Sequence, residues 1–142
     1  MLLIAAAVAL FLTISGFLAG WLSAENVERD ADEALIAAQA RGDVQGMLAR
    51  LNGCRPNPAC VATVRADARQ LRRPGEVKIV SLKSQTAYSL TGATGTTRLA
   101  WVVIGRLPVV QCIRVRRSGS FFTGIGVSLL SISAPIGNEA DC

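Results

Sequence analysis

MLLIAAAVALFLTISGFLAGWL, residues 1–22, is an apolar stretch without one charged side chain, and the first charge of the chain is Glu25. A helix of this length is about 33 Å long, which is enough to cross the hydrocarbon core of a bilayer. Signal peptides and membrane anchors usually carry positive charge before the apolar segment, and none precedes it here. Two explanations are open: a basic leader preceding Met1 has been removed, or the native N-terminus is short.

The residues after the apolar run indicate on which side of a membrane the rest of the chain lies. ENVERDADE (25–33) contains five acids and one arginine. Positive charge concentrates on the cytoplasmic side of membrane helices, whereas acidic flanks are tolerated on the other side. Residues 23–142 are therefore expected outside the cytoplasm, with 1–22 as a transmembrane or filament-core helix.

The four cysteines, Cys54, Cys60, Cys112 and Cys142, fit this location. An even count in an exported chain predicts two disulfides, in any of three connectivities. The segment CRPNPAC (54–60) contains two prolines that favour a turn, so a local Cys54–Cys60 pair is the economical choice and leaves Cys112–Cys142. A zinc site in this segment is disfavoured, because its spacer is long and the chain has no histidine.

Residues 23–53 are predicted to continue the first helix with an amphipathic half. No proline interrupts this stretch, and small or apolar residues recur at roughly helical spacing: Val27, Ala31, Ala34, Leu35, Ala38, Gly42, Leu48 and Leu51. The sequence NGC (52–54) ends the predicted helix, with Gly53 as its C-cap. Gly16 and Gly20 in the apolar half are either close-packing positions or places where the helix can loosen.

Residues 54–75 are predicted to form a disulfide loop followed by a short helix at 59–73. One face of this helix is apolar, and the other carries a basic stripe of Arg65, Arg69, Arg72 and Arg73. The stripe is either a solvated surface or a contact surface for an acidic partner. Pro74 and Gly75 end the helix.

Residues 76–142 show the alternation of a sheet, with strands predicted at 76–90, 96–105, 109–117 and 125–136. The stretch 76–90 is open to a break near Gln85, GATG (92–95) is predicted to turn, and SGSFFTG (118–124) is predicted to be a loop. Four antiparallel strands beside a long helix give an α+β fold. Cys112 alternates with Ile113, which places it on the face away from the helix, where a returning tail could reach it.

Charge and composition limit the classes of function. Residues 1–44 contain six acids and two arginines, net −4, and residues 45–142 contain four acids and thirteen bases, net +9. Few aromatic residues lie among these bases, so no nucleic-acid partner is expected. The absence of histidine and of phosphate-loop motifs predicts no enzyme, no catalytic or metal-binding residue, no cofactor and no small-molecule substrate.

The sequence of segments resembles the type IV filament superfamily of pilins and pseudopilins. In that family an apolar half-helix continues into an amphipathic half-helix, followed by a connecting loop, an antiparallel sheet and often a disulfide near the C-terminus, which Cys112 and Cys142 would form here. A peptidase removes a short basic leader, which accounts for the missing positive charge. Two features depart from the family: Ala5 stands where an early glutamate is usual, and no proline precedes Pro56.

The resemblance implies a structural subunit of an extracellular filament, used for instance in cell adhesion, that is held in the membrane before it assembles with copies of itself. The implied helical homopolymer would pack residues 1–22 at its centre. The acids Glu25, Glu28 and Asp30 would meet arginines of another copy. Those arginines are Arg69, Arg72, Arg73 and Arg114, and Ala5, Gly16 and Gly20 would lie in the packed helix. The chain also resembles membrane-anchored NTF2-like proteins associated with Mce complexes, which are accessory modules of cell-envelope complexes.

Overall fold

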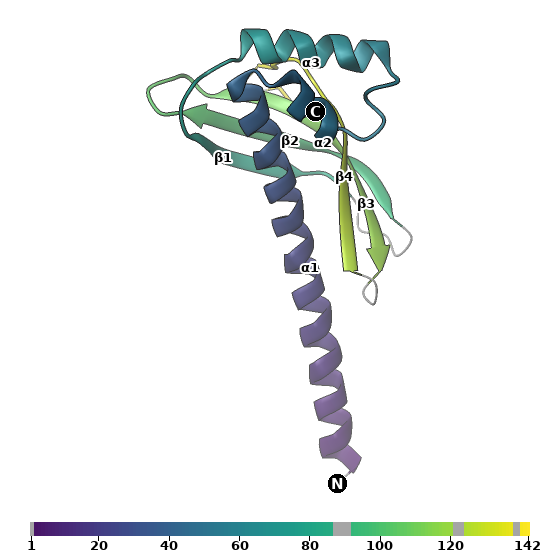
Figure 1. Ribbon diagram of the computed structural model, residues 1–142. Coiled ribbons are helices and arrows are strands. Elements are labelled where there is room, and N and C mark those ends of the chain that lie inside the picture. Colours follow the sequence, from purple (N-terminus) through teal and green to yellow (C-terminus); the bar gives the residue numbers. More distant parts are fainter. Residues whose placement is uncertain (1, 87–91, 121–123, 138–139) are drawn as a thin grey trace.

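The computed structural model describes residues 2–86, 92–120, 124–137 and 140–142. Its first element is a 40-residue helix, α1 (Leu2–Arg41), whose N-terminal part projects as a stalk from a compact head (Figure 1). The helix runs without interruption through residues 22–30, where an extended linker would have separated the stalk from the head. Among the described residues, no helix combines the length and the apolar character needed to cross a membrane.

The prediction of one helix reaching residue 52 is wrong, because α1 ends at Arg41 and a separate helix, α2 (Val44–Arg50), follows. Gly42 has a φ of 74°, a left-handed conformation that costs glycine little. Asp43 then caps α2, and its carboxylate accepts a hydrogen bond of 2.8 Å from the Gly46 N–H. Leu51 caps the C-terminus of α2, so Gly53 is not the C-cap that the sequence suggested; it has a φ of 77° in the following turn.

The short basic helix is α3 (Pro58–Gln70), close to the predicted 59–73. Asn57 is its N-cap: the side-chain oxygen accepts from the N–H groups of Ala59 and Cys60, and Pro58 occupies the first turn, where no N–H is missed. The apolar side of α3 packs into the core through Val64 and Ala68, as predicted, and the C-cap residue Leu71 is buried beside them.

The fold is α+β, and its single sheet has the antiparallel order β1-β2-β3-β4. The strands are β1 (Val77–Ser84), β2 (Ala93–Val103), β3 (Val109–Ser120) and β4 (Gly124–Ile132). The predicted GATG turn is largely strand, because β2 begins at Ala93. Parts of two predicted segments, 87–91 and 121–123, lie outside the described residues.

The core lies between one face of the sheet and the helices. Alternate residues of β2 and β3 point to the helices, among them Leu99, Trp101, Ile113 and Val115, all fully buried. From α1 the buried apolar side chains include Leu35 and Ile36. After β4 the returning tail continues the main-chain pairing with β3, where Ile136 forms an antiparallel bridge with Val110. On the opposite face of the sheet, Val110 and Ala100 are also buried.

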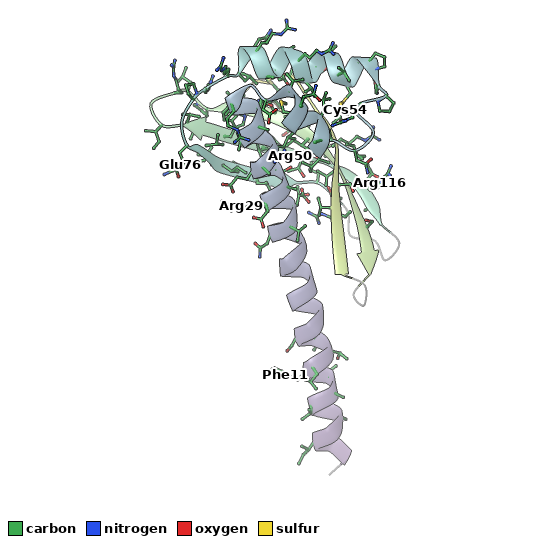
Figure 2. All side chains as sticks on the ribbon, in the orientation of Figure 1. Phe11, Arg29, Arg50, Cys54, Glu76 and Arg116 are labelled. Atoms are coloured by element: carbon green, nitrogen blue, oxygen red, sulfur yellow. A yellow bond between two sulfur atoms is a disulfide. The ribbon has the colours of Figure 1, made fainter. Side chains whose placement is uncertain are left out.

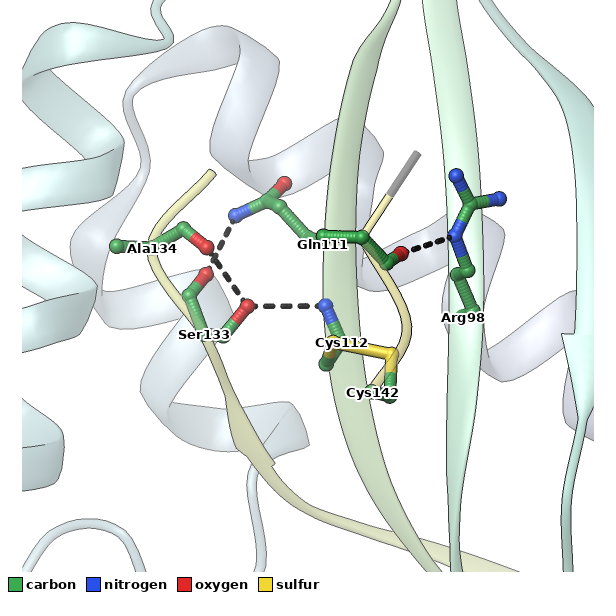
Figure 3. Close-up of a disulfide and its surroundings, with 7 residues drawn as sticks. Arg98, Gln111, Cys112, Ser133, Ala134 and Cys142 are labelled. Atoms are coloured by element: carbon green, nitrogen blue, oxygen red, sulfur yellow. Dashed lines mark hydrogen bonds between the residues drawn. A yellow bond between two sulfur atoms is a disulfide. The ribbon is translucent and has the colours of Figure 1, made fainter. Parts of the chain in front are cut away.

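Both predicted disulfides are present, Cys54–Cys60 and Cys112–Cys142. Figure 3 shows the second of them, on the face of β3 that points away from the helices, as the alternation predicted. The tail is held beside it by hydrogen bonds between side chains and the main chain: the Ser133 hydroxyl accepts from the Cys112 N–H at 2.9 Å, and Arg98 Nε donates to the Ala140 carbonyl at 2.9 Å. These contacts fix a segment that would otherwise fray.

Candidate functional site

The stalk exposes large apolar side chains around much of its circumference. Ile4, Phe11 and Leu12 are exposed to 70%, 69% and 63%, and Val8, Leu10 and Ile14 are exposed by more than half. Phe11 lies on the stalk well away from the head (Figure 2). Isolated apolar residues are common on protein surfaces, but a contiguous apolar surface marks a site of interaction. Ala5, Gly16 and Gly20 lie in this part of α1, which is not broken at either glycine.

The acidic segment at the junction of stalk and head divides into two sets. Glu25 and Asp30 are exposed, as an intermolecular role requires. Glu28 is completely buried and forms an ion pair with Arg117 of the same chain, so the expectation that it meets another copy is wrong. The reason is its position on the inner face of α1, which the sequence pattern had assigned to neighbouring Val27; the Val27 side chain is 42% exposed.

Glu28 is the centre of a buried polar cluster between α1 and the sheet. Its Oε2 accepts from Nε and Nη2 of Arg117 at 2.8 and 2.5 Å, and its Oε1 accepts from the Thr97 hydroxyl. Arg117 Nη2 also donates to the Ser84 hydroxyl at 3.1 Å. Two strands thus supply partners to one carboxylate, and Ser84 of a third strand supports its arginine partner; the contacts with the carboxylate offset the cost of removing its charge from water.

Asp32, one helical turn after Glu28, is equally buried but has no such partners. Neither of its carboxylate oxygens has a hydrogen-bond partner in the described part of the chain. Burial, with the nearby negative charge of Glu28 as a second cause, raises the pKa of Asp32 to about 8. The side chain is therefore protonated and neutral at pH 7.

A second polar cluster lies further along the same interface, around Gln111. The Gln111 side-chain oxygen accepts from Gln39 Nε2 and Trp101 Nε1, both at 2.9 Å. Its amide nitrogen donates to the Ser133 carbonyl at 2.9 Å and to Asp67 at 3.3 Å. Burial raises the pKa of Asp67 to about 6. This cluster joins α1, α3, two strands and the tail, which indicates a structural role.

The four arginines expected to contact another copy have different surroundings. Arg69 is exposed on α3, Arg72 is exposed just beyond its C-cap, and Arg114 is exposed on the outer face of β3. Arg73 is half-buried: it donates to the Leu107 carbonyl at 2.6 Å, and its guanidinium lies 5.6 Å from the centre of the Trp101 ring. Arg73 is therefore engaged within its own chain, unlike the other three side chains, which project into solvent.

A polar cleft of about 370 Å³ opens beside the buried Glu28–Arg117 pair. Its walls come from the start of the head in α1 and from β1, including Glu25, Arg29 and Ser81. In the described residues, no cluster of histidine, cysteine, aspartate or glutamate has the arrangement of a metal site.

Sequence reasoning missed Arg117 and Gln111, although a signal was present. Both residues share the alternation of Val109, Ile113 and Val115 along β3, so they had to face the helices. A polar residue on the apolar face of a strand requires a buried partner. The partners could not be named, because they lie 89 and 72 residues away in the sequence, as Glu28 and Gln39.

Comparison with known proteins gave no relative: no family model, no curated protein and no solved structure matches the chain.

Proposed function

We propose that this protein is the subunit of an extracellular filament, which assembles with copies of itself through the apolar stalk of α1. The observation that carries the proposal is the exposure of the six large apolar side chains between Ile4 and Ile14. Fully burying side chains of this size stabilises by about 1.5–3 kcal/mol each, so the six together contribute at most roughly 9–18 kcal/mol before the entropic cost of association.

The head supports the proposal through its shape and its covalent bonds. One helix joins the stalk to the core without a linker, so packing of the stalks would place the heads in fixed positions around them (Figure 1). The two disulfides suit an oxidising environment outside the cytoplasm. In this proposal the charge-free run 1–22 also holds the subunit in a membrane before assembly.

A second candidate is a membrane-anchored accessory module of a cell-envelope complex, of the NTF2-like kind. The break of α1 at Gly42 favours it, because two further helices, α2 and α3, then precede the sheet. By contrast, the resemblance to the filament family implies a single continuous helix before the connecting loop.

Electron microscopy of material sheared from cells that express the chain tests the first candidate. We expect thin fibres that contain the protein, and mass spectrometry of its N-terminus would identify any processing. Phe11→Asp should abolish the fibres because it places a charge among packed apolar side chains. Leu107→Asp is the matched control, since Leu107 is 82% exposed but lies on the head. A membrane-bound monomer, or a subunit in a discrete complex, would exclude the filament and support the second candidate.

A further inference from the structure

The two free edges of the sheet are protected very differently. Strand β1, at one edge, carries exposed Lys78 and Lys83. Strand β4, at the other edge, reads GIGVSLLSI and has neither a charged residue nor a proline. Lysine and proline on an edge strand prevent unwanted pairing with other chains. The edge of β4 lacks this protection, which is expected where a strand normally receives a partner.

The main-chain groups of β4 show which residues face this edge. The Leu129 carbonyl accepts from the Asn52 N–H at 2.7 Å, and Leu51 forms an isolated parallel bridge with Leu129. Because main-chain groups alternate in direction along a strand, those of Val127 also point to the free edge. Leu51 and Asn52 thus pair with the outer edge of β4 at Leu129. In the described residues this pairing does not continue to Val127.

A groove of about 680 Å³ runs along the same edge. Its apolar walls include Ala31 and Ala34 of α1 and Leu48 of α2, and Arg50 and Arg55 line it as well. Both arginines are exposed, and no acidic residue is among the lining residues. Figure 2 labels Arg50 where α2 lies beside α1. The groove therefore combines a free strand edge, small apolar walls and positive charge.

We propose that the edge of β4 binds an extended, acidic segment of another protein, which pairs with Val127 as a fifth strand. Alternate side chains of such a segment would face the apolar walls, and its carboxylates would lie near Arg50 and Arg55. A second copy of this chain fits poorly: its own β1 edge would bring lysines against these arginines, and β4 against β4 would bring arginine against arginine. This binding does not depend on filament formation.

The test uses the full chain in detergent micelles and a synthetic heptapeptide of alternating glutamate and valine. The matched peptide has lysine in place of glutamate. By fluorescence anisotropy we expect the glutamate peptide to bind at least about ten-fold more tightly. Hydrogen exchange of the Val127 N–H should slow when the glutamate peptide is present, because that group becomes paired. Equal binding of the two peptides, or no binding of either, would overturn the proposal.

Two sets of variants locate the site. Val127→Pro removes the outward N–H but leaves the pairing with β3, so it should abolish binding, whereas Val127→Ala should retain it. Arg50→Glu with Arg55→Glu should reverse the preference between the peptides, and Arg65→Glu with Arg69→Glu on α3 should not. If Val127→Pro does not fold, the peptide preference of the variant with Arg50→Glu and Arg55→Glu tests the proposal. A concentration-dependent dimer that Val127→Pro abolishes would assign the edge to a second copy, against the proposal.

Discussion

Glu28 and Asp32 occupy successive turns of α1 and are both fully buried, yet the protein accommodates them in opposite ways. Glu28 forms an ion pair with Arg117, whereas Asp32 has no hydrogen-bond partner in the described part of the chain and holds a proton instead. The two solutions depend on each other, because the negative charge of Glu28 is one of the causes that raise the pKa of Asp32. The contribution of these two residues to stability therefore depends on pH.

We expect the wild-type chain to lose stability as the pH rises from 6 to 8, and we expect Asp32→Asn to abolish this loss. The folded chain keeps the Asp32 proton to about pH 8, and the unfolded chain releases it near the ordinary aspartate pKa of 3.8. The folded state thus binds more protons in this window, and its free energy of unfolding falls as pH rises. The slope approaches about 1.4 kcal/mol per pH unit. Thermal unfolding followed by circular dichroism measures it.

Asp30→Asn is the matched control, because Asp30 is exposed on the same helix. Asp67 shares the direction of the shift, but its pKa of about 6 confines most of its contribution to lower pH. A wild-type chain whose stability is constant from pH 6 to pH 8 would contradict the assignment to Asp32.

Arg117→Met should lower the free energy of unfolding by about 3–5 kcal/mol, because it leaves the Glu28 carboxylate buried without its cation. The double variant Glu28→Met with Arg117→Met should recover much of this loss, since no charge then remains buried. Arg116→Met, on the exposed face of the same strand, should change stability little. Urea unfolding of the four chains measures the coupling, and additive losses would disprove it.

At the scale of elements, the features that can be predicted from the sequence are those that neighbouring residues determine. The alternation along 109–117 placed Cys112 on the outer face, and the prolines of 54–60 indicated a local disulfide; both predictions are confirmed. The end of α1 was missed, because Gly42 is compatible with a helix interior as well as with its end. Packing against the segment that follows α3 decides between them: the Arg73 N–H donates to the Ala40 carbonyl at 2.9 Å, and this contact cannot be read from the local pattern.

Gly42→Ala should destabilise the head by more than Gly53→Ala. Both glycines have φ near +75°, at 74° and 77°, so alanine is strained at either position. Only at Gly42 would the new methyl group meet neighbours, at 3.2 Å from both the Ala68 carbonyl oxygen and the Arg72 side chain. Chemical unfolding should show a loss of about 1–2 kcal/mol at Gly53 and a larger one at Gly42. Equal losses would mean that the Ala68 carbonyl and the Arg72 side chain move aside at no cost in stability.

The whole molecule combines a head that has a buried core with a stalk whose large apolar side chains are exposed. The core residues all lie between Leu35 and Ile132, and the buried polar clusters start at Glu28. Composition alone indicated this division, because residues 1–22 contain no charge. What composition could not indicate is which residues of the acidic segment belong to the head, since that depends on the rotation of α1 against the sheet.

A chain that starts at residue 23 should therefore fold as a monomer with the near-ultraviolet circular dichroism of the full protein. It retains both disulfides and every core residue of the described chain, and it loses the exposed apolar side chains between Ile4 and Ile14. Sedimentation velocity measures its mass. If the shortened chain still assembles, the stalk is not the surface that joins copies.

The continuity of α1 has a mechanical consequence. A force that pulls the head away from a stalk held at its N-terminal end would travel along an unbroken helix into the residues packed on the sheet, because the first break lies beyond them at Gly42. No soft joint at residues 22–30 can extend to relieve the load. Detachment would require the Glu28–Arg117 pair and the packed turns up to Ala40 to slide past the sheet together. The contacts between α1 and the sheet would thus be loaded in shear, and many of them would share the load at once.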